Sequence, residues 1–87
     1  MKFVVFSIRD SAADTFGVPM FMASKGQAIR AFSDEVNRAD ANNMLAKHPQ
    51  DFELFYLGTF DGDTAMFTQD ANPESVIRGV DCLTKVQ

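Results

Sequence analysis

The residues of this chain whose types and spacing could do chemistry are aromatic and basic. Phe and Tyr recur along the segment Asp51–Gln69, DFELFYLGTFDGDTAMFTQ. Aromatic rings on an exposed sheet can stack on unpaired bases, which is worth roughly 1–3 kcal/mol per base and tolerates any base sequence. Arginine and lysine side chains beside such rings would contact phosphates. The combination therefore predicts a surface for single-stranded nucleic acid.

Six side chains are the candidate DNA contacts, two aromatic and four basic: Phe55, Tyr56, Arg9, Lys25, Arg30 and Arg38. Phe6 and Phe60 belong to the same aromatic group. In the competing interpretation, these aromatic residues form the core or a homodimer interface, and composition alone favours the homodimer. The net charge is −4, from eight basic and twelve acidic residues with the basic ones dispersed. This charge predicts weak, salt-sensitive contact with DNA at most.

No motif for enzymatic chemistry occurs in the chain. The phosphate-binding glycine loops, the H-E-x-x-H zinc motif and the G-x-S-x-G nucleophile motif are absent. Cys82 is the only cysteine and His48 the only histidine, so neither has a partner of its own type for a zinc site. Asp61 and Asp63 lack the spacing of a calcium loop and suit a turn instead. The sequence therefore predicts a non-enzymatic protein without cofactor or metal.

Two segments are predicted to form the centre of a sheet. Lys2–Arg9, KFVVFSIR, and Phe52–Phe60 are rich in residues that favour strands. Asp61–Asp63 supplies a turn after the second of them, and Ala65–Thr68 returns as the other strand of a hairpin. Side chains alternate along a strand, and here both sets are apolar. Each face of the sheet therefore needs a cover.

Two helices are predicted from their capping residues and apolar stripes. Ser24 as N-cap and Gln27 three residues later form a capping box for a helix at Lys25–Arg38. Asn72 followed by proline predicts a second helix at Pro73–Leu83. The apolar stripes are Ile29, Phe32 and Val36 in the first helix, and Val76, Ile77, Val80 and Leu83 in the second.

The remaining segments are predicted to be less regular. Residues 10–16 suggest a loop, and residues 44–46 a short helical turn. Residues 17–23, GVPMFMA, suggest an edge strand or an extended segment, because Pro19 cannot donate to a sheet ladder. Cys82 lies in an apolar helical pattern and is expected to be a small core residue.

The 87 residues predict a single domain, residues 1–87, of the α+β class. The expected architecture is a small, mainly antiparallel sheet of three or four strands with two helices packed on one face. A ferredoxin-like arrangement is possible if residues 17–23 supply the fourth strand. The helices would cover one face, and a second copy of the chain is the first candidate for the other.

Three segments resemble the small non-structural protein family of gokushoviruses and related microviruses, which are single-stranded DNA phages. They are FSIRD (Phe6–Asp10), PMFMASKGQAIRAFSDEVN (Pro19–Asn37) and HPQDFELFYLGTFD (His48–Asp61). The resemblance implies an accessory protein made in the infected bacterium, and members are described as DNA-binding or as assisting single-stranded genome synthesis or packaging. It carries over no established functional residues, although Arg9, Lys25 and Arg30 lie within the matching segments.

The functional prediction is a phage accessory protein, a binding module that assists single-stranded DNA synthesis or genome packaging, with weak DNA binding. The alternative is a homodimeric protein-interaction or assembly factor that does not touch DNA. The expected partners are a second copy, single-stranded DNA and a phage replication or assembly protein. No signal peptide or membrane-spanning run is evident, which predicts a soluble protein in the host cytoplasm.

Overall fold

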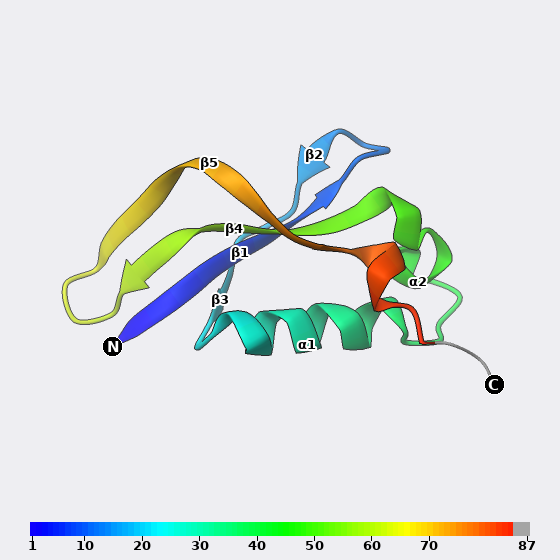
Figure 1. Cartoon of the computed structure of the whole chain (residues 1–87), viewed down its shortest axis with the longest axis horizontal. Helices are drawn as coiled ribbons and strands as arrows, with labels where there is room; N and C mark the ends of the chain where they lie inside the picture. Colours follow the sequence, from blue (N-terminus) through cyan, green and yellow to red (C-terminus); the bar gives the residue numbers. More distant parts are fainter. Residues whose placement is uncertain (85–87) are drawn as a thin grey trace.

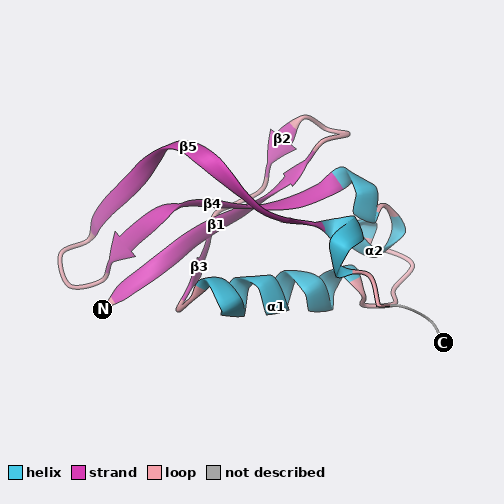
Figure 2. Ribbon diagram, in the orientation of Figure 1, coloured by secondary structure: helices cyan, strands magenta, loops and turns pink. Residues whose placement is uncertain are grey.

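The computed structural model describes residues 1–84, an α+β fold with an antiparallel sheet and one long helix (Figures 1 and 2). Its strands are β1 (Lys2–Asp10), β2 (Thr15–Phe16), β3 (Met20–Met22), β4 (Phe52–Asp61) and β5 (Met66–Arg78). Its helices are α1 (Lys25–Val36), α2 (Met44–Lys47) and the 3-10 turns η1 (Pro49–Asp51) and η2 (Gly79–Cys82). The predicted class and the mainly antiparallel sheet are confirmed.

The long strands β1 and β4 form the centre of the sheet. β4 pairs with β1 on one side and with β5 on the other, which makes β5 an outer strand. The second edge of β1 is shared by two short strands, because β2 pairs with its end and β3 with its middle. The predicted central strands and the hairpin are therefore confirmed, and residues 20–22 supply the expected edge strand. The predicted loop at residues 10–16 is wrong at its two ends, because Asp10 ends β1 and Thr15 and Phe16 form β2.

Helix α1 begins as predicted. The Ser24 hydroxyl accepts a hydrogen bond from the Gln27 backbone N–H at 3.1 Å, and the Gln27 side chain accepts one from the Ala23 N–H at 2.8 Å. Figure 1 shows α1 lying along one side of the sheet. The buried side chains of the helix pack with those of β1, β4 and η2 in one core: Phe6, Ala28, Phe32, Val36, Leu54 and Cys82.

The second predicted helix, Pro73–Leu83, is wrong. Residues 73–78 continue β5, and only the short turn η2 follows them. Residues 74–78 pair with residues 53–56 of β4, and this pairing packs Val76 and Ile77 against the core. These tertiary contacts override a local capping signal. Pro73 fits because β5 is an outer strand and because the register shifts opposite residues 56–58, which places four residues, 70–73, against Leu57 alone. The bulge is the arch of β5 in Figure 1.

The turns at the far end of the core are closely packed. A Cβ atom on Gly79 would lie 2.4 Å from the Pro49 carbonyl oxygen, so only glycine allows η2 to pack against η1. Asn43 caps the predicted short helix α2, and its buried side chain donates to the carbonyl oxygens of Glu35 and Arg38 at 2.8 and 3.0 Å. These contacts close the end of the core without leaving a buried side-chain polar atom unpaired in residues 1–84.

Candidate functional site

The face of the sheet opposite α1, here called the open face, carries most of the aromatic side chains. Antiparallel partners point to the same side of a sheet, and successive residues point to opposite sides. Phe6 and Leu54 are fully buried toward α1. Their neighbours Ser7 and Phe55, which pair with each other, therefore belong to the open face. The open face is the surface that the sequence predicted would need a second cover.

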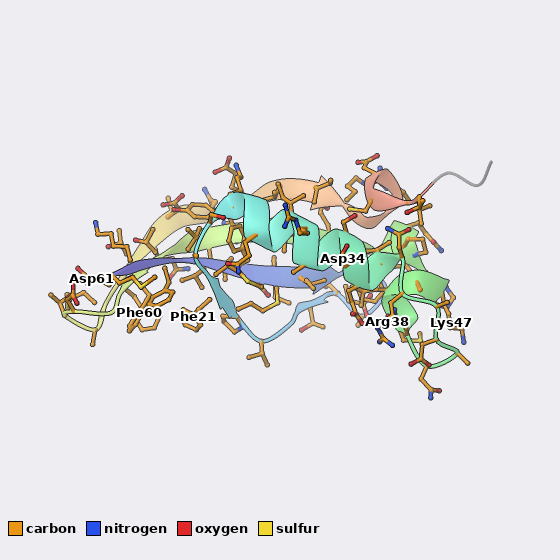
Figure 3. The ribbon with its side chains drawn as sticks, turned by 90° about the horizontal axis from the view of Figure 1, so that it is seen from below. Phe21, Asp34, Arg38, Lys47, Phe60 and Asp61 are labelled. Carbon is orange, nitrogen blue, oxygen red and sulfur yellow. The ribbon has the colours of Figure 1, made fainter. Side chains whose placement is uncertain are left out.

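A cluster of four phenylalanines lies at the hairpin end of the open face, and we call it the hairpin-end cluster: Phe3, Phe21, Phe60 and Phe67. The ring centroids of Phe21 and Phe67 are 6.1 Å apart, although β3 and β5 are separated by both central strands. Strands three positions apart in a flat sheet would be roughly 14 Å apart. The sheet therefore curls toward its open face, and the rings cover one another in part. Figure 3 shows Phe21 beside Phe60.

An apolar groove of about 430 Å³ adjoins the hairpin-end cluster. Gly58 forms part of its floor with a φ of +154°, and a Cβ atom there would lie 2.0 Å from the Thr68 carbonyl oxygen. Glycine therefore lets β5 approach β4 at this point. The groove is lined by Val5, Val18, Pro19, Phe21, Leu57, Gly58, Thr59, Phe67, Thr68 and Gln69.

The other end of the open face, the Arg9 end, combines aromatic rings with a cation. The Arg9 guanidinium carbon lies 5.9 Å from the centre of the Phe16 ring, and Phe16 meets Phe55 edge to face at 5.3 Å. Arg9 also forms an ion pair with Asp14 at 2.5 Å, which neutralises much of its charge. Between the two ends, the buried Ser7 hydroxyl donates to the Gly17 carbonyl oxygen at 2.7 Å. The connection from β2 to β3 thus separates them.

A small polar hollow of about 150 Å³ lies next to the Arg9 end. Arg9 and Arg78 flank Glu53 in the strand register, so the hollow contains two cations and carboxylates. The Ser75 hydroxyl donates to Glu53. The lining residues are Arg9, Ser11, Gln50, Asp51, Phe52, Glu53 and Arg78. A phosphate group could pair with an arginine in this hollow, but the neighbouring carboxylates would repel it.

The structure does not bring the six predicted contact residues together. Only Arg9 and Phe55 lie on the open face. Tyr56 points to the other side, where its ring meets Phe6 at 5.9 Å. Lys25 and Arg30 are exposed on α1, the helix that covers the opposite side of the sheet. The remaining aromatic candidates divide in the same way, because Phe6 is core and Phe60 belongs to the hairpin-end cluster.

Arg38, the sixth candidate, is occupied by carboxylates. Its guanidinium pairs with Glu35 at 2.7 Å and with Asp40 at 2.9 Å. The hydrogen bonds to Glu35 and then Asp40 raise the pKa of Arg38, and the Arg38 hydrogen bond lowers the pKa of the Glu35 carboxyl. Figure 3 places Arg38 and Lys47 at the opposite end of the molecule from Phe21 and Phe60. The position and ion pairs of Arg38 therefore give no support to a phosphate contact.

The sequence analysis missed three exposed rings of the open face, those of Phe16, Phe21 and Phe67. Phe16 lies in the predicted loop, and Phe21 lies in the segment predicted to be an edge strand or an extended segment. Phe67 lies two residues from Ala65 in the predicted return strand, and its alternation with Met66 was the available signal. All three are exposed, at 42%, 46% and 63% respectively.

The other chemical candidates have structural roles. Asp61 accepts a hydrogen bond from the Asp63 N–H at 2.9 Å, which lowers the pKa of Asp61 and fits the predicted turn role. Cys82 is buried in the core as predicted, and burial raises the pKa of its thiol. Within residues 1–84, no three potential metal ligands come together. No helix in that part of the chain is long and apolar enough to cross a bilayer.

Comparison with known proteins identifies the family. A family model described as Phage ORF5 protein matches residues 3–82. Protein ORF5 of Chlamydia phage 1 is 36% identical over 69 residues, which span 77% of this chain and 72% of that protein. No solved structure matches the chain. The resemblance to a family of small phage proteins is thereby confirmed. This chain belongs to the phage ORF5 protein family.

Proposed function

We propose that this protein is a non-structural, non-enzymatic accessory protein that assists synthesis or packaging of the single-stranded phage genome in the host cytoplasm. It acts as a binding module, and the Arg9 end of the open face makes weak contact with single-stranded DNA. The observation that carries the proposal is the cluster of Arg9, Phe16 and Phe55, in which the Phe16 ring is 42% exposed beside a cation. An exposed ring beside a guanidinium is the arrangement that holds an unpaired base next to its phosphate.

The same geometry keeps the proposed contact weak. Arg9 already pairs with Asp14, and the neighbouring hollow places Arg78 beside Glu53 and Asp51. With a net charge of −4, the chain as a whole repels the DNA backbone at long range. Base stacking therefore supplies most of the affinity, and the single phosphate contact from Arg9 adds a modest salt dependence.

Fluorescence anisotropy with labelled single-stranded DNA at low salt tests the proposal. Phe16→Ala should weaken binding by roughly 5- to 100-fold, because it removes one stacking platform. Arg9→Gln should also weaken it, and Arg30→Gln on α1 is the matched control, which should bind as the wild type does. The DNA part of the proposal is wrong if the wild type does not bind at about 100 μM, the weak limit of non-specific affinity. It is also wrong if Phe16→Ala binds normally.

A protein-interaction or assembly role without DNA contact is the second candidate. Its support is the hairpin-end cluster, where the groove is lined by uncharged residues only. Such a surface suits an apolar protein partner better than a phosphate backbone. Affinity purification from infected cells separates the two roles, because a replication role predicts the phage replication protein or genome and an assembly role predicts capsid precursors.

A further inference from the structure

The hairpin end of the open face exposes more apolar surface than a small chain normally leaves uncovered. Phe21 is 46% exposed, Phe67 63% and Val18 85%. A phenylalanine side chain has roughly 200 Å² of surface, so the two rings together leave roughly 200 Å² open. Val18 adds roughly 100 Å² more. A standard interface buries about 800 Å² per partner, a little over half of it apolar. This end therefore supplies most of the apolar share of one interface.

The charge pattern at this end favours an identical partner. No ionisable residue lines the groove, whereas the chain as a whole carries a net charge of −4. Two copies of an acidic chain repel each other except where their facing surfaces are uncharged. A two-fold interface also places the same patch against itself, so the patch must tolerate its own copy. An uncharged aromatic patch meets this requirement, and it offers no cation to the phosphates of DNA.

The edge of β5 supports the same partner. Outer strands are normally protected against pairing by charged residues, proline or bulges. In β5 all of these devices lie at or beyond residue 70: Asp70, Pro73, Glu74, Arg78 and the two register shifts. The preceding residues 66–69, Met-Phe-Thr-Gln, have none of them and carry Phe67 of the hairpin-end cluster. An identical strand can pair with this segment in the antiparallel direction about a two-fold axis.

We propose that a second copy of this chain covers the hairpin-end cluster, in a two-fold symmetric homodimer centred on Phe67 and residues 66–69 of β5. The Arg9 end lies outside the patch, beyond Ser7 and Gly17. The dimer thus leaves the DNA contact accessible. The inference does not rest on DNA binding.

Sedimentation of the full chain over a range of concentrations tests the proposal. The wild type should show a monomer–dimer equilibrium. Phe67→Asp should raise the dimer dissociation constant by roughly 30-fold or more, because it places a carboxylate against its own copy in an apolar interface. Val18→Asp should act in the same direction. Val18 is 85% exposed, so this variant keeps the test valid if Phe67→Asp fails to fold.

Met44→Asp is the matched control, because Met44 is 51% exposed on α2, outside the open face. It should dimerise as the wild type does. A wild type that stays monomeric at about 100 μM overturns the proposal, and so does a dimer that Phe67→Asp and Val18→Asp both leave intact. Normal DNA binding by a monomeric Val18→Asp variant would show that the two sites are separate. A Phe16→Ala variant that loses DNA binding but still dimerises would also show that the two sites are separate.

Discussion

The two faces of the sheet are built from the same two strands, yet they are covered in different ways. Toward α1, Phe6 and Leu54 are fully buried and meet the helix residue Phe32 in a closed core. On the open face, Phe21 and Phe67 contact one another but remain about half exposed. The curl of the sheet lets the rings of this face cover one another only in part. Side chains that share a strand are thus enclosed in the core on one face and partly exposed on the other.

The largest effect is expected when one phenylalanine is removed from the core between α1 and the sheet and, for comparison, one from the open face. Phe32→Ala should destabilise the monomer by roughly 3–5 kcal/mol, because it leaves a cavity in the closed core. Phe67→Ala should cost less, roughly 1–2 kcal/mol, since more than half of its ring is already in water. Urea unfolding followed by circular dichroism gives both values. Low protein concentration keeps dimerisation from adding to the cost of Phe67→Ala.

Equal costs for the two substitutions would contradict the contrast. They would mean that the hairpin-end cluster is part of the monomer's core and that its rings are not available to a partner. A small cost for Phe32→Ala would instead mean that α1 is loosely held on the sheet.

A smaller effect is expected from Gly58, which joins the groove to the sheet. Gly58→Ala should destabilise the chain by roughly 1–3 kcal/mol, because its Cβ would collide with the Thr68 carbonyl oxygen and φ is positive. The change should displace β5 and widen the groove, so it should weaken dimerisation more than DNA binding. Gly26→Ala is the matched control, because no atom lies within 4 Å of the added Cβ. A Gly58→Ala variant as stable as the wild type would show that β5 does not approach β4 so closely.

The smallest expected effect is acid destabilisation, which lies outside both faces. The pKa values of Glu35, Asp40 and Asp61 are lowered, chiefly by hydrogen bonds from Arg38, the Asn42 N–H and the Asp63 N–H respectively. A carboxyl group whose pKa is lower in the folded state than in the unfolded state stabilises the fold at pH values above its unfolded pKa. This contribution to stability is lost as the pH falls through the folded-state pKa. The midpoint temperature of thermal unfolding should therefore decrease slightly when the pH is lowered below about 4.

Arg38→Gln should remove part of this acid dependence, because Glu35 and Asp40 lose their shared partner. Lys47→Gln, at a cation that forms no ion pair within residues 1–84, should leave it unchanged. An Arg38→Gln variant whose stability depends on pH as strongly as that of the wild type would show that these ion pairs are not formed in solution.

Local sequence signals predicted the elements that local interactions determine. The capping box at Ser24 and the stripe through Phe32 placed α1 correctly, and alternating residues placed β1 and the hairpin. The helix predicted after Asn72 failed because its capping signal competed with the pairing of β5 along β4. Pairing between distant strands is a tertiary interaction, and it overrides a propensity worth less than about 1 kcal/mol per residue.

The candidate site was predicted only in part, for a related reason. Alternation along β4 correctly put Phe55 and Tyr56 on opposite faces, yet both were chosen as DNA contacts. Which face stays open depends on where α1 packs, and this is a tertiary feature. The basic residues of α1 were grouped with Arg9 by charge alone, although the sheet separates Lys25 from Phe55.

A titration followed by nuclear magnetic resonance tests the central claim most directly, that DNA contacts the open face of the sheet. The chain contains nine phenylalanines, and ¹⁵N labelling of phenylalanine alone reports on both faces at once. Single-stranded DNA added at low salt should shift the amide signals of Phe16 and Phe55 and leave that of Phe32 unchanged. Shifts at Phe32 without shifts at Phe16, or no shifts at any phenylalanine, would contradict the account.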